Sequence, residues 1–191
     1  MTFLGDFIKG DFVKPLQTNG KIQKNNPAHI KEPIFEGGFK FEHVNLACEA
    51  AKKAFHPWAR LRLSERLNHA LKIKELYQTY AEQLAILITK EVGKPLWESR
   101  SEVQSMINKI DICINESLPL VAEKKVENAR GPIPGFLRYK ARGVMAVIGP
   151  FNLPGSLPNG HIIPALLTGN TVVFKPSEKT PATGQLIAEI F

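Results

Sequence analysis

Cysteine and dense basic runs are both scarce in this sequence of 191 residues. Only Cys48 and Cys113 are present, which is too few for a disulfide scaffold. The 25 Lys and Arg residues outnumber the 18 Asp and Glu residues and give a net charge of +7, but no basic run is longer than a pair. Because a nucleic-acid-binding surface usually concentrates its positive charge in a stripe, we expect no nucleic-acid partner.

Long hydrophobic runs are absent as well. Asp6, Lys9 and Asp11 interrupt the apolar core that a secretory signal needs. Residues 143–174 carry no charged side chain, yet they contain five glycines and four prolines, so no 18 consecutive apolar residues can span a bilayer. With 43% hydrophobic and 23% charged residues, the composition is that of an ordinary globular protein. We therefore expect a cytoplasmic chain with no membrane partner.

The first 117 residues divide into a turn-rich part and a helical part. Residues 1–41 alternate short apolar pieces with turn formers, which indicates short strands and loops. From residue 42 onward, apolar side chains recur at intervals of three and four, as in amphipathic helices. Thr79 and Glu82 have the spacing of a capping box, and Gly93 with Pro95 indicates a helix stop and restart. The predicted apolar faces are Val44, Cys48, Ala51, Phe55 and Trp58; Ala81, Leu84, Ala85 and Ile88; and Val103, Ile107, Ile110 and Ile114.

The remaining residues change character twice. Residues 118–142 are rich in charge, Gly and Pro, which predicts an extended hairpin or arm. Two apolar runs follow, Val144–Ile148 and Thr171–Phe174, and both are expected to be strands buried on both faces. The 22 residues between them suit a right-handed helical crossover between parallel strands. A last helix is expected where Thr180 can cap and Pro181 can take the first helical position.

These patterns predict an α/β fold in three parts. Residues 1–122 form strands and helices, residues 123–142 form an arm, and residues 143–191 form the first βαβα of a doubly wound parallel sheet. Because such a sheet normally has more than two strands, we expect this one to be incomplete.

Chemistry is expected in the loops that follow the two predicted parallel strands, because ligands of open α/β sheets bind beyond the carboxyl ends of strands. Asn152 lies between Pro150 and Pro154, which restrict the backbone and would position an amide donor. Lys175 and Glu178 could hydrogen-bond the vicinal hydroxyls of a sugar. On local pattern alone, these three residues could equally be a turn former and a solvated turn.

Five short motifs in order make the sequence recognisable. They are Ala54-Phe55 with Trp58, Glu91 with Gly93-Lys94-Pro95, residues 150–154, Gly169-Asn170 and residues 175–178. Together they resemble the NAD(P)-dependent aldehyde dehydrogenase superfamily over nearly the whole chain. Residues 102–110 and 157–167 are most similar to the branch that oxidises N-succinylglutamate 5-semialdehyde in arginine breakdown.

The resemblance implies site residues. Asn152 would donate its amide to the oxyanion that forms when a cysteine thiolate attacks the aldehyde substrate. The residues implied for NAD binding are Ile148, Pro150, Phe151, Asn152, Lys175, Ser177 and Glu178. Leu153 and Leu157 are implied beside the substrate.

His161 stands where many members of the superfamily have a lysine, although histidine fits the suspected branch. A proton-handling role and a satisfied histidine on a helix face are both open for this side chain. The arm at residues 123–142 matches the strands through which the family forms homo-oligomers.

The family's nucleophilic cysteine and general-base glutamate lie beyond the last motif present. We expect Cys48 and Cys113 to be buried and unreactive on helix faces, so the 191 residues alone should show no dehydrogenase turnover. Two alternatives stay open. One is a non-catalytic assembly module, and the other is a basic nucleic-acid-binding domain, which only the net charge favours.

Overall fold

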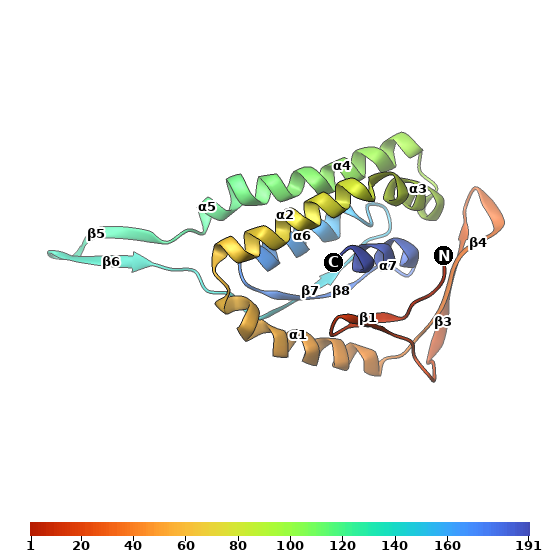
Figure 1. The fold of residues 1–191 in the computed structure, drawn as a ribbon, viewed down its shortest axis with the longest axis horizontal. Coiled ribbons are helices and arrows are strands. Elements are labelled where there is room, and N and C mark those ends of the chain that lie inside the picture. The colour runs from red at the N-terminus through yellow and green to blue at the C-terminus, as the bar shows by residue number, and fades with distance from the viewer.

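The computed structural model describes residues 1–191 as four small sheets and a set of helices (Figure 1). The elements in chain order are β1 (Asp6–Ile8), β2 (Asp11–Val13), β3 (Gly20–Asn26), β4 (His29–Phe39), α1 (Glu42–Arg60), α2 (Leu63–Thr79), α3 (Ala81–Val92), α4 (Leu96–Ile112), a π-helical turn (Cys113–Ser117), α5 (Leu118–Leu120), β5 (Lys124–Arg130), β6 (Ile133–Leu137), β7 (Val144–Ile148), α6 (Ser156–Leu167), β8 (Thr171–Lys175) and α7 (Pro181–Ile190). The expected order of strands, helices, hairpin and βαβα is confirmed.

The helical part has the predicted apolar faces with one exception. Leu84, Ala85 and Ile88 of α3 are buried, as are Val103, Ile107 and Ile110 of α4. Gly93 ends α3 in the left-handed region, with φ of 84°, and Pro95 precedes the start of α4. This stop and restart agrees with the sequence, because a glycine adopts the left-handed region at little cost.

The N-terminal half of α1 differs from its predicted face. Val44 and Cys48 are exposed, whereas Ala51 is buried. His43 is buried instead, and its Nδ1 lies 2.7 Å from Oδ2 of Asp6 in β1. Because adjacent residues of a helix point about 100° apart, a helix that turns residue 43 toward β1 leaves residues 44 and 48 outside. The expectation of a buried Cys48 is therefore wrong.

The capping box predicted at Thr79 and Glu82 is also absent. The Thr79 hydroxyl donates to the carbonyl of Glu75 at 2.9 Å, and Glu82 pairs with Arg100 of α4. Tyr80, between the two helices, makes no side-chain cap. The local spacing suited a cap, but Thr79 bonds back to its own helix and Glu82 takes a tertiary partner.

The predicted arm is a two-stranded antiparallel hairpin that projects from one end of the molecule (Figure 1). Every residue of β5 is exposed, and Gly135 is the one residue of β6 that is not. Apolar side chains of the hairpin, including Val126, Ile133 and Phe136, are half or more exposed.

Strands β7 and β8 are parallel and joined by α6, so the predicted crossover is confirmed. Their register runs from Val144 opposite Thr171 to Ile148 opposite Lys175. Both α1 and α6 contact the two strands, and Figure 1 shows them on opposite sides of the pair. The expectation that both strands are buried on both faces is wrong, because Val147 is the one buried residue of β7 and Thr171 the one buried residue of β8. Ile148 at the end of β7 is 69% exposed. The cause is that β7 pairs only with β8, and no strand covers its other edge.

One hydrophobic core joins the helical part to the βαβα part. It combines side chains of α2, α3 and α4 with Ile163 and Leu167 of α6 and Leu186, Ile187 and Ile190 of α7. None of the helices is both long enough and apolar enough to cross a membrane.

Candidate functional site

The loops that follow β7 and β8 lie side by side, which brings the predicted site residues to one edge of the parallel pair. The main-chain N–H of Gly149 donates to the carbonyl of Lys175 at 2.8 Å. The ammonium of Lys179 lies 4.6 Å from the centre of the Phe151 ring, a distance at which a cation and an aromatic face attract each other. The two loops therefore form one continuous surface.

The apolar members of this surface are open to solvent. Ile148 is 69% exposed and Phe151 is 50% exposed, while Pro150 between them is half-buried. An exposed isoleucine and an exposed phenylalanine at the carboxyl end of a strand provide the kind of flat apolar surface that a planar ring can cover. Their predicted role in binding a cofactor stays a prediction.

The polar members follow β8. Nζ of Lys175 lies 3.8 Å from Oε2 of Glu178, and both side chains are more than half exposed. A hydrogen bond from its own main-chain N–H, helped by the charge of Lys175, lowers the pKa of Glu178, so this carboxylate is ionised at neutral pH. Ser177 is buried, and its hydroxyl oxygen accepts from the main-chain N–H of Lys179 at 3.2 Å. Ser177 therefore shapes the turn that presents Lys175 and Glu178.

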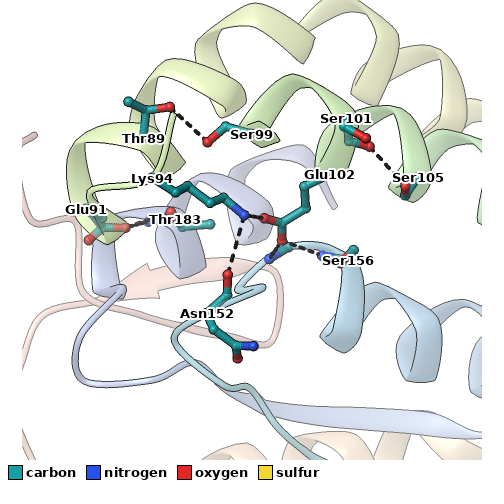
Figure 2. Close-up of polar contacts among 11 residues, drawn as sticks. Thr89, Glu91, Lys94, Ser99, Ser101, Glu102, Ser105, Asn152, Ser156 and Thr183 are labelled. Atoms are coloured by element: carbon teal, nitrogen blue, oxygen red, sulfur yellow. Dashed lines mark hydrogen bonds and ion pairs between the residues drawn. The ribbon is translucent and has the colours of Figure 1, made fainter. Parts of the chain in front are cut away.

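Asn152 has a held main chain and a free side chain. Its carbonyl accepts from Nζ of Lys94 at 3.4 Å, whereas its side-chain amide is exposed and makes no hydrogen bond within the chain. Figure 2 shows that amide turned away from Lys94 and Glu102. A donor left free in this way can serve an external acceptor.

The other predicted residues lie on or beside α6. Leu153 is half-buried in the loop, and Leu157 and His161 are exposed. Leu157 and His161 are four residues apart and so share one face of the helix. The imidazole of His161 makes no hydrogen bond within the chain, and its role stays open between the two alternatives.

The N-terminus of α6 is capped by a carboxylate from another helix. Oε1 of Glu102 in α4 accepts from the main-chain N–H groups of Gly155 at 2.8 Å and Ser156 at 3.0 Å. Its Oε2 forms an ion pair with Lys94, and Figure 2 shows the two contacts together. A carboxylate at this place satisfies unpaired helix N–H groups and interacts favourably with the positive end of the helix dipole.

A second buried carboxylate does the same for α7. Oε1 of Glu91 accepts from Ala182 N–H at 2.8 Å, and its Oε2 accepts from the N–H and hydroxyl of Thr183 at 2.7 and 2.6 Å. Burial raises the pKa of Glu91, against the opposing effect of these hydrogen bonds. The expected cap from Thr180 is wrong, because this residue occupies the N-cap position but its buried hydroxyl has no hydrogen-bond partner.

The C-terminus of α6 is held by donors from α1 and α2. The Trp58 indole N–H donates to the carbonyl of Leu166, and the Arg66 guanidinium donates to that of Leu167, both at 3.0 Å. Beyond the helix, the side-chain oxygen of Asn170 accepts from Arg142 and Gly143 N–H at 2.7 and 3.1 Å.

Sequence reasoning did not predict these long-range contacts with the ends of α6 and α7. The sequence places Glu91 and Lys94 in a motif and Trp58 in a motif and on an apolar helix face, but none of these patterns predicts the hydrogen bonds that the three side chains make. The one local signal for the missing caps was the absence of any acidic residue in the first turns of α6 and α7.

The two cysteines lie outside this surface. Cys113 is buried in the helical core, and burial raises the pKa of its thiol, which makes it a poor nucleophile. Cys48 is exposed on α1. No group of three or more His, Cys, Asp or Glu side chains lies close enough to hold a metal ion.

Residues 13–191 match the model of the aldehyde dehydrogenase family. The chain is 43% identical over 186 residues to N-succinylglutamate 5-semialdehyde dehydrogenase of Vibrio cholerae, a match that covers 97% of this chain and 37% of that relative. The enzyme of the same name from Novosphingobium aromaticivorans is 45% identical over 171 residues, which cover 90% of this chain and 36% of that relative. The chain thus spans little more than a third of the length of these relatives.

Solved structures give the same picture. An NAD-dependent benzaldehyde dehydrogenase from Corynebacterium glutamicum superposes with a TM-score of 0.87 at 28% identity, over 100% of this chain and 41% of that one. An NADP-dependent glyceraldehyde-3-phosphate dehydrogenase from Bacillus halodurans, complexed with NADP, has a TM-score of 0.87 at 26% identity, over 100% of this chain and 40% of that one.

Proposed function

The chain belongs to the aldehyde dehydrogenase family, and we propose that it serves the NAD-dependent oxidation of N-succinylglutamate 5-semialdehyde to N-succinylglutamate. The observation that carries this proposal is the identity of 42–46% with relatives that bear this enzyme's name. The alternative is that the substrate is another aldehyde, since the family model by itself does not specify which aldehyde an enzyme oxidises.

The surface beyond β7 and β8 fits a nicotinamide dinucleotide. Ile148, Pro150 and Phe151 offer an apolar face for a ring, and Lys175 and Glu178 offer a donor and an acceptor for ribose hydroxyls, on the turn that Ser177 shapes. When bound, this group accepts a hydride from the substrate. An ionised carboxylate accepts hydrogen bonds from a ribose but repels a 2′-phosphate, so Glu178, whose pKa is lowered, supports NAD rather than NADP.

Asn152 is proposed as the oxyanion donor. Its amide is exposed and unpaired while its main chain is anchored, and a preorganised donor of this kind stabilises the charge that develops on a carbonyl oxygen by about 3 kcal/mol. Leu153 and Leu157, next to it along the chain, are proposed beside the substrate. His161 is proposed as a polar neighbour of the same site.

The thiolate and the general base of the reaction are proposed to come from residues other than these 191. Cys113 is buried with a raised pKa, and Cys48 lies on α1, outside the surface formed by the two loops. The chain by itself is therefore expected to form no NADH from a semialdehyde.

Residues 123–142 are proposed as the surface through which copies of the protein associate. The hairpin is exposed along both strands and carries exposed apolar side chains, and an uncovered strand edge invites pairing. The division into residues 1–122, 123–142 and 143–191 is kept as a proposal about how the whole protein is organised.

The test uses two samples, the 191-residue chain and the longest natural protein that contains it. Absorbance at 340 nm should report NADH formation from N-succinylglutamate 5-semialdehyde in the longer protein and none in the chain alone. A lower kcat/KM for this substrate than for benzaldehyde would overturn the substrate proposal. Turnover by the chain alone would show that it contains its own nucleophile.

Cofactor choice has a separate test. Glu178→Gln should narrow or reverse the preference for NAD over NADP in binding titrations, with Glu189→Gln, an exposed carboxylate on α7, as the matched control. An unchanged preference would remove Glu178 from the cofactor site.

A further inference from the structure

A buried ion pair ties the loop that carries Asn152 to the helical part of the molecule. We propose that Lys94 and Glu102 are positioning residues that set the place of the Asn152 amide. This inference rests on the proposed function, in which that amide is the oxyanion donor. Neither residue reaches the exposed face of the loop, so both act through the loop's main chain.

Glu102 anchors the end of the loop. Its side chain is 1% exposed, and its Oε1 accepts both N–H groups at the junction between the loop and α6, those of Gly155 and Ser156. The fit against α4 is close, because a Cβ on Gly155 would lie 2.6 Å from the sulfur of Met106. The junction therefore packs closely against α4, and its hydrogen bonds to the carboxylate oppose its moving away.

Lys94 anchors the middle of the loop. Its side chain is 8% exposed, and its ammonium pairs with Oε2 of Glu102 while it donates to the carbonyl of Asn152 at 3.4 Å. The cation therefore holds the main chain of Asn152 directly and neutralises the carboxylate that holds residues 155 and 156. Figure 2 shows the two contacts meeting at the Lys94 ammonium, with the Asn152 amide projecting to the other side.

The two anchor points restrict the position of the Asn152 main chain. Two residues separate Asn152 from the second anchor point at Gly155, and one of them is Pro154, whose backbone torsion is restricted. A catalytic donor must be held to within roughly half an ångström of its productive position. A buried pair acting on the main chain meets this need without occupying the amide itself.

Two exposed ion pairs that involve α3 provide control variants. Lys90 pairs with Glu32, and Glu82 pairs with Arg100, and all four side chains are about half exposed. Neither pair contacts residues 149–156. Charge removal at Lys90 or Glu82 therefore breaks an ion pair of α3, the helix that precedes Lys94, without touching the loop.

Amide hydrogen exchange of the 191-residue chain, followed by NMR, tests the anchoring without any turnover. In Lys94→Met and Glu102→Gln, the exchange rates at Gly155 and Ser156 should rise at least tenfold, while those at Ala182 and Thr183, which Glu91 caps, should change by less than twofold. Lys94→Arg should keep exchange near the unmodified rate, because it retains the cation. Lys90→Met and Glu82→Gln should change neither set. Equal increases at both helix starts, or no increase at Gly155, would overturn the inference.

A kinetic cycle in the longest natural protein tests the link to Asn152. Lys94→Met should lower kcat at least tenfold and leave the dissociation constant of NAD within twofold. Adding Lys94→Met to Asn152→Ala should cost far less than tenfold, because the amide that it positions is already gone. If the loss of kcat in the double variant equals the product of the losses in the two single variants, Lys94 does not act by positioning Asn152. Failure of the proposed function has a different signature, which is the absence of NADH formation by the unmodified protein.

Discussion

The hairpin of β5 and β6 and the β7–α6–β8–α7 segment are neighbours in sequence but opposites in how they are held. The hairpin stands clear of the molecule, and nearly all its residues are exposed. The segment that follows is fixed by side chains of other helices, with the buried Glu102 and Glu91 and the half-buried Arg66 at its helix ends. The hairpin is held by the ladder between its own two strands, whereas the segment that follows adds contacts from distant helices to its own strand pairing.

The contrast separates two ways of placing functional residues. Asn152, proposed to act on the substrate, lies on a loop whose main chain is held by side chains distant in sequence, while its own side chain stays free. Residues proposed to meet a second copy of the chain need only a regular edge, because the partner completes the structure. Changes to the clamps should therefore lower stability, and changes to the hairpin should not.

The largest expected effect is at Glu91. Glu91→Leu leaves three donors of Ala182 and Thr183 without a partner in a buried site, which should lower the free energy of unfolding by about 3 to 5 kcal/mol. Urea denaturation followed by circular dichroism measures this loss. Glu82→Gln is the control, because its exposed pair is worth less than about 1 kcal/mol. Equal losses in the two variants would show that the cap contributes nothing special.

A smaller effect is expected at Arg66, which holds the C-terminus of α6. Arg66→Met removes the guanidinium donors to the carbonyls of Leu167 and Leu61 and a positive charge near the negative end of the helix dipole. The free energy of unfolding should fall by about 1 to 2 kcal/mol. Arg62 is an exposed arginine at the start of α2, the helix that contains Arg66, and Arg62→Met should lower the free energy of unfolding by clearly less. A larger loss at Arg62 would reverse the interpretation.

The stability that Glu91 contributes should depend on pH, and the raised pKa fixes the direction. Burial raises the pKa of this carboxyl above its usual 4.5, so the folded state binds the proton more tightly than the unfolded state. Its contribution to stability is complete below pH 4.5 and is lost as the pH rises through the folded pKa. The difference in unfolding free energy between the unmodified chain and Glu91→Gln should therefore grow as the pH falls from 7 toward 5, by at most about 1.4 kcal/mol per pH unit. A difference that shrinks on acidification would contradict the raised pKa.

The smallest effect on stability is expected in the hairpin. Phe136→Ser and Val126→Asp change exposed side chains and should alter the unfolding free energy by less than about 0.5 kcal/mol. If the hairpin is the association surface, both should reduce self-association of the longest natural protein in sedimentation velocity. Loss of stability without loss of association would mean that the hairpin serves the fold instead.

Local patterns predicted the elements well and their surroundings poorly. The faces of α3 and α4 follow from apolar spacing alone, because a helix that buries one stripe repeats it every three or four residues. The parallel crossover follows from the length between two apolar runs. In contrast, the exposure of Ile148 depends on which strands lie beside β7, and no spacing within the run reports that.

The caps show the same limit for the site. Thr180 stands where a local cap is expected, but the acceptor is Glu91, 91 residues away from the N–H of Ala182. Lys94 and Glu102 reach a loop more than 50 residues further along. Asn152, Lys175 and Glu178 could be selected from the sequence because they follow apolar strands, whereas no local pattern around Lys94 or Glu102 predicts their contacts with the loop of Asn152.

The long-range clamps on α6 bear on the order in which the chain acquires structure. This helix has no charged residue and contains Gly160 and Pro164, so by itself it is a weak helix former. The groups that complete it are Trp58, Arg66 and Glu102, and all of them precede it by more than 50 residues. During synthesis these residues leave the ribosome first and can already be folded when α6 emerges. The loop of Asn152 would then take its shape against helices that precede it in synthesis.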